Sequence, residues 1–316
     1  TLGLVACGGD NNSSGDTVNP VDPAPANSST VTLRVMETTD LHANVMNFNY
    51  YQNAQDDTVG LVKTASLIDA ARAEVDNSVL VDNGDLLQGS PLGDYVAKVK
   101  GLETNEVHPI YKAMNLLNYD VANVGNHEFN YGLPFLKEAI DDTNFPYISA
   151  NVFFDDADND TTNDIPYFTP YLLKDKQVLD TEGNAHTITI GYIGFLPPQI
   201  LQWDKNNLET RVIAKDIVDM ANHYVPEMKA AGADIIIAIA HSGLTTDTRA
   251  GGDENASFYL SQVNGINAIM FGHAHRNFPG DSGYDGIDAI DNVKGTLNGI
   301  PAVMPGYWGK YLGYID

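Results

Sequence analysis

The sequence contains few cysteines, few cations and no long apolar run, and each shortage excludes a class of protein. Its only cysteine is Cys7, so no disulfide can form within the chain, and cysteine usage gives no indication of the redox compartment. Lys and Arg number 17 against 42 Asp and Glu, a formal net charge of -25 that would repel a polyanion. A stable complex with nucleic acid is therefore not expected. No stretch reaches the roughly 18 apolar residues of a membrane-spanning helix.

Motifs of several other classes are also missing. The chain has no G-x-S-x-G nucleophile turn, no reactive cysteine besides Cys7, and no G-x-x-x-x-G-K-[ST] phosphate loop. The acidic run 155–160 fails the EF-hand template, because the sixth position counted from Asp156 is Thr161 and the twelfth is Tyr167. This run is therefore predicted to be a solvated loop.

The first residues of the chain resemble a bacterial lipoprotein signal. In Leu4-Val5-Ala6-Cys7-Gly8, small residues precede a cysteine that would be lipidated and become the first residue of the mature chain. Residues 1–6 would then be a signal-peptide remnant, and residues 7–30, rich in Gly, Asn, Ser, Asp and Pro, a flexible tether. This pattern predicts an exported periplasmic or cell-envelope lipoprotein that meets the membrane only through a lipid anchor at Cys7. The alternative is a free or buried thiol near a ragged terminus.

From about Val31, strand-like and helix-like patterns alternate. The predicted strands are 32–37, 78–81, 121–124, 187–195, 233–240, 266–271 and 302–304. The predicted helices are 61–75, 110–117, 133–140 and 213–231. With 316 residues, 43% of them hydrophobic, the chain can bury a large core. The alternation predicts an α/β catalytic domain with a largely buried sheet over residues 31–316.

Five short polar motifs follow predicted strands, where an α/β sheet gathers its ligands. They are Asp40-Leu41-His42, Asn83-Gly84-Asp85, Gly125-Asn126-His127-Glu128, His241-Ser242-Gly243 and Gly272-His273-Ala274-His275. Each motif alone is weak, since Asn-Gly, for example, is also a common turn. Together they hold five of the eight histidines. They predict a metal site, because imidazole and carboxylate groups suit Zn²⁺, Mn²⁺ or Fe²⁺ and thiolates are absent.

The carboxylate of Asp85 can join two cations, since ions about 3.5–4 Å apart usually share one carboxylate. Such cations lower the pKa of bound water, so a metal-bound hydroxide would serve as the nucleophile. They would also reverse the local field of this acidic chain, which makes a small phosphorylated substrate acceptable.

The motifs resemble those of the calcineurin-like metallophosphoesterases, and within that family those of the 5′-nucleotidase group. The likeness extends from about Val31 to Asp316. It implies a four-layer α/β/β/α sandwich with mixed sheets, and metal-dependent hydrolysis of nucleotide phosphate esters. Relatives continue into a second domain that binds the base and the phosphate, which this chain is expected to lack.

The resemblance also implies a role for each motif residue. The first of two divalent ions, Zn, Mn, Co or Fe, would be held by Asp40, His42 and His275, and the second by Asn126, His241 and His273, with Asp85 between them. His127 would lie over the scissile phosphate, donate to its oxygens and protonate the leaving ribose oxygen. Many relatives orient this histidine with an aspartate three residues later, where this chain has Asn130. His127 and Asn130 are the candidate catalytic residues, although Asn130 supplies no charge.

Further features resemble the branch that combines 2′,3′-cyclic-nucleotide 2′-phosphodiesterase with 3′-nucleotidase activity. They are Asn130 within the segment 125–132, Phe48-Asn49-Tyr50-Tyr51, His275 in place of a glutamine, and the segment 301–309. A small nucleotide is thus the implied substrate. Tyr50, Tyr51 and Trp308 are predicted mainly to pack rather than to bind it. Without a second domain, the chain would keep metal binding and hydrolysis of activated substrates but lose most nucleotide affinity.

Two other functions stay open on the sequence. A 5′-nucleotidase or UDP-sugar diphosphatase would use the same metals. A surface lipoprotein that binds metal without turnover is the alternative outside the enzymes, although loss of a ligand or of His127 would be expected for it.

Overall fold

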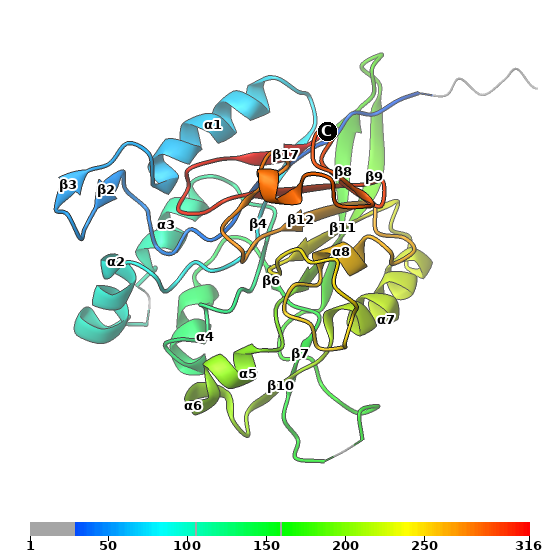
Figure 1. Cartoon of the computed structure of the whole chain (residues 1–316). Coiled ribbons are helices and arrows are strands. Elements are labelled where there is room, and N and C mark those ends of the chain that lie inside the picture. Colours follow the sequence, from blue (N-terminus) through cyan, green and yellow to red (C-terminus); the bar gives the residue numbers. More distant parts are fainter. Residues whose placement is uncertain (1–28, 105, 159) are drawn as a thin grey trace, which may run out of the picture.

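The computed structural model describes residues 29–104, 106–158 and 160–316, which fold around two facing β-sheets (Figure 1). Cys7, the predicted signal-peptide remnant and most of the predicted tether lie outside these residues. Among the described residues, no helix combines the length and apolar character needed to cross a membrane.

The first sheet has its strands in the order β17-β1-β4-β5-β6. Their bounds in that order are Gly313–Ile315, Arg34–Thr38, Ser78–Asp82, Val121–Asn123 and Tyr147–Ile148. Strands β1, β4, β5 and β6 run parallel, whereas β17 is antiparallel to β1. Because the parallel strands point the same way, the loops after β1, β4 and β5 leave the sheet at one edge.

The second sheet has the order β14-β15-β16-β12-β11-β9-β8, with β13 paired to β16. The bounds are β8 Tyr171–Leu179, β9 Ala185–Phe195, β11 Ile235–Ala240, β12 Ala268–Phe271, β13 Asn277–Phe278, β14 Ile290–Asp291, β15 Thr296–Leu297 and β16 Ile300–Pro305. Parallel pairs join β9, β11, β12 and β16, while β8 and β15 are antiparallel to their neighbours. Both sheets are therefore mixed, as predicted.

Apolar side chains fill the space between the sheets. Val35 and Val81 from the first sheet meet Ile237, Ile239 and Met270 from the second, and all five are buried. The other face of β11 packs under helices. Burial on both faces explains why this strand is a continuous apolar run in the sequence.

Helices cover the outer face of each sheet (Figure 1). The first sheet carries α1 (Leu61–Ala73), α3 (Pro109–Asn115) and α4 (Leu133–Asp141), and the second carries α7 (Ile217–Ala230) and α8 (Ser257–Leu260). Ile68 of α1, Met114 of α3 and Leu136 of α4 share one buried cluster with Leu80 of β4. The layers follow the order α/β/β/α, which confirms the predicted fold.

The remaining elements are short. They are the paired strands β2 (Phe48–Asn49) and β3 (Ala54–Gln55), the paired strands β7 (Val152–Phe154) and β10 (Val212–Ala214), the helices α2 (Pro91–Asp94), α5 (Ile200–Trp203) and α6 (Lys205–Leu208), the π-helix η1 (Tyr95–Lys100) and the 3-10 helix η2 (Ser282–Tyr284). Helix α6 is attached to the loop after β5. Asn207 of α6 donates through Nδ2 to the carbonyl oxygens of Phe129 and Asn130, at 3.0 and 3.1 Å.

One predicted helix needs correction, and one long strand was missed. The predicted helix 213–231 begins as strand β10, because Asp216 is extended and accepts the N–H of Asp219 at 2.8 Å, so the helix starts only at Ile217. Strand β8 was not predicted, since Lys174-Asp175-Lys176 gives it little apolar alternation. The described part of the acidic run 155–160 lies outside helices and strands, as expected.

Candidate metal centre

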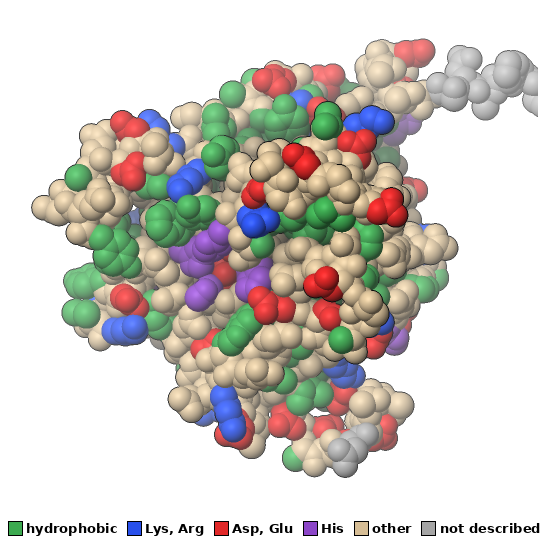
Figure 2. All heavy atoms as spheres, viewed as in Figure 1, with side chains coloured by type: hydrophobic (Ala, Val, Ile, Leu, Met, Phe, Trp, Pro, Cys, Tyr) green, Lys and Arg blue, Asp and Glu red, His purple; other side chains and the backbone are tan. Residues whose placement is uncertain are grey.

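The five polar motifs meet at one edge of the two sheets. Asp40 and His42 follow β1, Asp85 follows β4, and His127 follows β5. From the second sheet, His241 follows β11, and His273 and His275 follow β12. Figure 2 shows histidine side chains gathered on one face of the molecule with acidic side chains beside them. The structure thus brings together motif residues as far apart in the chain as His42 and His275, which are separated by 233 residues. This follows because the strands that precede the motifs end at the same edge of the sheets.

Asp40 lies at the centre of one group. Its Oδ1 is 3.2 Å from Nε2 of His275 and 4.0 Å from Nε2 of His42. The two imidazoles face each other, with their Nε2 atoms 3.0 Å apart. Three side chains with ligand atoms this close can hold one cation.

Asp85 is shared by two further groups. Its Oδ2 lies 3.0 Å from Nε2 of His241, 3.9 Å from Nε2 of His42 and 4.0 Å from Nε2 of His127. Ligand atoms of Asp85, His241 and His273 are close enough to hold a metal, as are those of His42, Asp85 and His127. The Asp85 carboxylate therefore lies between side chains of both sheets.

Buried polar atoms without a hydrogen bond test whether these residues suit a metal. Of the buried side-chain atoms that make no hydrogen bond in the described residues, three belong to the motifs: Asp40 Oδ1, Asn126 Oδ1 and His241 Nε2, the last lying 3.0 Å from Asp85 Oδ2. A buried polar atom left without a partner is costly, and all three atoms are of the kind that bind divalent cations. The donor set fits cations of the transition series.

Contacts outside the cluster fix which nitrogen each imidazole presents. His42 Nδ1 lies 2.6 Å from the carbonyl oxygen of Gln88, and His241 Nδ1 lies 2.7 Å from that of Asn83. A carbonyl only accepts, so Nδ1 carries the proton and Nε2 is left for a metal. His273 is the reverse, since its Nε2 lies 2.9 Å from Glu254 Oε1 and leaves Nδ1 free.

The charges of the cluster are strongly coupled. Burial opposes ionisation of Asp85, yet His241, His127 and His42 hold the pKa of its carboxyl below the usual range. Burial also disfavours the imidazolium of His241, but the carboxylates of Asp85 and Asp40 outweigh it and raise its pKa to about 10. The carboxylates of Asp40 and Asp85 therefore favour positive charge beside them, which bound cations can supply.

Backbone conformation in the motifs is unusual. Asp40, His42, Asp85, His273 and His275 have positive φ angles between 47° and 70°. This left-handed region costs most non-glycine residues about 1–2 kcal/mol. Residues with such strained backbone conformations are frequent at functional sites, where the surrounding structure keeps them in place.

Glycines allow the motif loops to approach one another. A Cβ on Gly125 would lie 2.4 Å from Asp85 Oδ1, and one on Gly272 would lie 2.2 Å from Thr39 Oγ1 and 2.8 Å from Asp40 Oδ2. Only glycine fits at such distances. Gly125 and Gly272 are thus spacers in the cluster rather than simple loop residues.

The candidate catalytic pair is in contact. His127 Nδ1 lies 2.6 Å from Asn130 Oδ1, and the His127 side chain is 36% exposed. One imidazole edge thus faces Asn130, and Nε2 faces the cluster.

A family comparison identifies the fold carrying this cluster. The model of the calcineurin-like phosphoesterases matches residues 33–277, most of the chain and all of its predicted ligands. The chain belongs to the calcineurin-like phosphoesterase family. The predicted resemblance is confirmed.

Several phosphoesterases of this family are similar to the chain. The 2′,3′-cyclic-nucleotide 2′-phosphodiesterase/3′-nucleotidase of Salmonella typhimurium is 57% identical over 93% of this chain, and that of Yersinia enterocolitica is 55% identical over 92%. The chain spans only 44% and 43% of the length of these relatives. The crystal structure of calcineurin-like phosphoesterase YfkN from Bacillus subtilis has a TM-score of 0.84 and 46% identity, covering 90% of this chain and 84% of that one.

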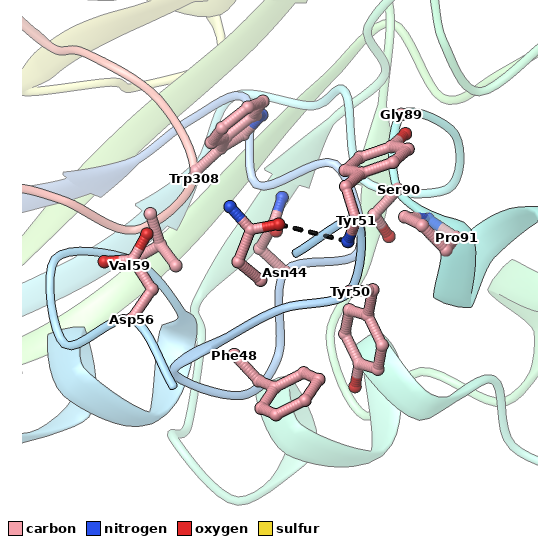
Figure 3. Close-up of a pocket in the computed structure, with 11 residues that line it drawn as sticks. Asn44, Phe48, Tyr50, Tyr51, Asp56, Val59, Gly89, Ser90, Pro91 and Trp308 are labelled. Atoms are coloured by element: carbon pink, nitrogen blue, oxygen red, sulfur yellow. Dashed lines mark hydrogen bonds between the residues drawn. The ribbon is translucent and has the colours of Figure 1, made fainter. Parts of the chain in front are cut away.

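An aromatic pocket lies next to His42 of this cluster, and Figure 3 shows the residues that line it. Its lining includes Phe48, Tyr50, Tyr51 and Trp308, and it borders the cluster at Gly89, where a Cβ would meet the His42 ring at 2.4 Å. Tyr51 is 76% exposed and Tyr50 is 37% exposed. Tyr50 packs edge-on against Phe48, with ring centroids 5.1 Å apart, whereas the more exposed Tyr51 packs little against the protein.

Four further residues touch the cluster without having been assigned a role from the sequence. Glu128 accepts backbone N–H groups from two motif loops, and Glu254 contacts His273. Trp203 stacks on His273 with ring centroids 5.7 Å apart, and Asp204 accepts from Asn130. Glu254, Trp203 and Asp204 lie outside the motifs, and only their position in space marks them. Glu128 lies in a motif, but as a side chain that organises the loops.

Proposed function

We propose that this chain is the catalytic part of a phosphoesterase that hydrolyses 2′,3′-cyclic nucleotides and 3′-nucleotides with two divalent cations. The observation that carries the proposal is the position of Asp85 between the two halves of the cluster, 3.0 Å from His241 and 3.9 Å from His42. One shared carboxylate flanked by imidazoles from both sides is the arrangement expected of a two-metal hydrolase.

The ligand assignment follows the cluster. One cation would be held by Asp40, His42 and His275, and the other by Asn126, His241 and His273, with Asp85 bridging. When bound, the cations supply Lewis acidity that activates water and neutralises the phosphate charge. That charge compensation is needed because the chain is strongly acidic and its buried carboxylates would otherwise repel the substrate.

The residue assigned to proton transfer is His127. Its Nε2 lies 4.0 Å from Asp85 Oδ2, next to the residues that would hold the cations, and its Nδ1 faces Asn130 Oδ1 at 2.6 Å. From there Nε2 can donate to a phosphate oxygen and protonate the leaving ribose oxygen. No protein nucleophile is required.

The choice of branch is supported by two residues of the chain and by the names of its relatives. Asn130 and His275 stand where the resemblance implies aspartate and glutamine in many 5′-nucleotidases. The relatives at 55–57% identity are named 2′,3′-cyclic-nucleotide 2′-phosphodiesterase/3′-nucleotidase. These observations favour the 3′ branch over 5′-nucleotidase or UDP-sugar diphosphatase activity.

Parallel assays test the proposal. The purified chain, stripped with a chelator and reloaded with Mn²⁺, Zn²⁺ or Co²⁺, is given 2′,3′-cyclic AMP, 3′-AMP, 5′-AMP and UDP-glucose. We expect turnover to return with metal and to favour the first two substrates. Preference for 5′-AMP or UDP-glucose would establish the other branch, and bound metal without turnover would establish a binding protein.

Histidine variants provide the matched control. His127→Ala should lose about 10²–10⁴-fold in kcat while keeping its metal, because it removes the acid and no ligand. His223→Ala removes an exposed imidazole on α7 and should change neither activity nor metal content. Loss of metal in His127→Ala would contradict the assignment of His127.

We further propose export and a lipid anchor at Cys7, supported by the sequence Leu4-Val5-Ala6-Cys7-Gly8. Metabolic labelling with a radioactive fatty acid in a bacterial host should mark the wild-type protein. A Cys7→Ser variant labelled to the same extent would exclude the anchor.

A further inference from the structure

We propose that Asp204 is a positioning residue for His127 and acts through Asn130. Asn130 Nδ2 donates to both carboxylate oxygens of Asp204, at 3.1 and 2.9 Å, while Asn130 Oδ1 faces His127 Nδ1 at 2.6 Å. The three side chains thus form one continuous hydrogen-bond network that ends at His127, the candidate acid. The inference rests on the proposed function, in which His127 acts on the substrate.

The chemistry of the three side chains determines which group donates and which accepts in these hydrogen bonds. A carboxylate only accepts hydrogen bonds, so Asp204 turns the NH₂ group of Asn130 toward itself. Asn130 Oδ1 is then the atom that faces His127, and it also only accepts. His127 Nδ1 therefore carries a proton, and Nε2 is the nitrogen that faces the cluster and exchanges protons there. Without Asp204, the amide of Asn130 is free to turn over and offer its NH₂ group to the ring.

The fold holds Asp204 in place. It lies at the junction of α5 and α6 and is only 7% exposed. Its carbonyl oxygen accepts from the N–H of Asn207 and Leu208, and Asn207 Nδ2 binds the carbonyls of Phe129 and Asn130. Both sides of the Asp204–Asn130 contact are therefore anchored to the same short helix.

The neighbour of Asp204 strengthens the case that this segment serves the site. Trp203 stacks on His273, with ring centroids 5.7 Å apart and an interplanar angle of 27°. Two successive residues of the segment thus contact two different histidines, His273 directly and His127 through Asn130. Asp204, which lies beyond Asn130 as seen from His127, also supplies the negative charge that Asn130 lacks.

The kinetic test compares leaving groups. 4-Nitrophenol leaves readily without a proton, whereas phenol and the ribose oxygen of 3′-AMP benefit from an acid. In Asp204→Asn, kcat should fall about tenfold for phenyl phosphate and 3′-AMP, within the range known for outer contacts, and less than about threefold for 4-nitrophenyl phosphate, with little change in KM. Equal losses on all substrates, or no loss, would overturn the proposal.

Exchanging the two side chains provides the rescue. Asn130→Asp places a carboxylate against Asp204 and should be impaired by charge repulsion. The double variant Asn130→Asp/Asp204→Asn restores one carboxylate and one amide in reversed order, and should regain most of the kcat lost in Asp204→Asn. A double variant no better than Asp204→Asn would count against positioning through Asn130.

A buried aspartate elsewhere is the matched control. Asp180 is 4% exposed, accepts from backbone N–H groups and from His186 Nε2, and lies on the β8–β9 hairpin away from the cluster. Asp180→Asn should leave all three substrates unchanged. An equal leaving-group effect in Asp180→Asn would overturn the role of Asp204.

Nitrogen NMR separates failure of the inference from failure of the proposed function. In ¹⁵N-labelled protein, with the His127 signals identified by their loss in His127→Gln, the ring should be protonated at Nδ1 in the wild type and mixed in Asp204→Asn. This result would support the role of Asp204 even if the wild type hydrolysed none of the substrates. A wild-type ring without a proton on Nδ1, or an identical ring state in Asp204→Asn, would overturn it.

Discussion

Glu128 Oε2 accepts the backbone N–H of Asp85 at 2.8 Å, which joins the loop after β5 to the loop after β4. The same oxygen accepts the N–H of Gly125 at 2.7 Å, and Oε1 accepts those of Leu86 and Leu87. Glu128 is fully buried, so these four donors satisfy a charge that water cannot reach. The shared carboxylate Asp85 is thus held by a second carboxylate that cannot itself contact a metal in this arrangement.

Replacing Glu128 with glutamine should loosen both loops. Each carboxylate oxygen accepts two N–H groups, and an amide would turn its own NH₂ toward two of these donors. We expect Glu128→Gln to lower the free energy of unfolding by about 2–4 kcal/mol and to weaken metal binding. Urea unfolding and metal titration measure this. Glu106→Gln, which alters an exposed partner of Lys100, should change neither the free energy of unfolding nor metal binding. Equal effects of Glu128→Gln and Glu106→Gln would contradict the role of Glu128 in holding the two loops.

A methyl group on Gly84 should damage the cluster. Gly84 has φ of 85°, and a Cβ there would lie 2.3 Å from the backbone nitrogen of Gly125. We expect Gly84→Ala to destabilise the fold by on the order of 3 kcal/mol and to reduce kcat more than tenfold, because the loops after β4 and β5 must separate. Gly101 has a similar φ of 78° with nothing within 4 Å, so Gly101→Ala should cost only about 1 kcal/mol of backbone strain and spare activity. Thermal unfolding and steady-state kinetics separate the two effects.

Removing the shared carboxylate should lower metal content. In Asp85→Asn the shared side chain loses its charge. We expect at most one ion per chain. The loss of metal affinity should exceed the roughly 10–100-fold loss that is typical when a residue contacting only a ligand side chain is replaced. Asp82→Asn is the control on the same strand, since burial raises the pKa of Asp82 well above its ordinary value and an amide resembles the protonated form. Elemental analysis of dialysed protein measures both variants. Full occupancy in Asp85→Asn would exclude the bridge.

Stability in mild acid should depend on His108. Burial lowers the pKa of this imidazole from 6.5 to about 4, while its Nδ1 accepts the N–H of Ile110 at the start of α3. Between those pH values the unfolded chain binds a proton that the folded protein does not, so the free energy of unfolding falls as the pH drops. The contribution of His108 is about 1.4 kcal/mol per pH unit, about 3 kcal/mol in all.

His108→Asn isolates this contribution, because asparagine keeps an acceptor for Ile110 but does not titrate. The free energy of unfolding, measured by urea at a series of pH values between 6.5 and 4, should decline less steeply in the variant. Parallel curves would show that His108 is protonated equally in both states.

The alternation of segments predicted an α/β domain with a largely buried sheet and five polar motifs after its strands, whereas the four layers and the ligand roles were implied by the family resemblance. Apolar strands such as β11 and amphipathic helices such as α4 carry their period in the chain, because burial on one or both faces selects residues locally. The meeting of the motif residues was also predictable, because histidine and aspartate residues directly after parallel strands lie at the edge where those strands end together. Both inferences depend on information that lies within a few neighbouring residues.

The tertiary structure decided which further side chains serve the cluster. Asp204 and Glu254 lie in segments without a motif, and their contacts with Asn130 and His273 arise only when distant loops fold onto the same edge. The polar strand β8 was likewise fixed by its pairing with β9 and not by its own pattern. Hydrogen bonds between residues far apart in the chain leave no period in the sequence, so only packing in three dimensions determines them.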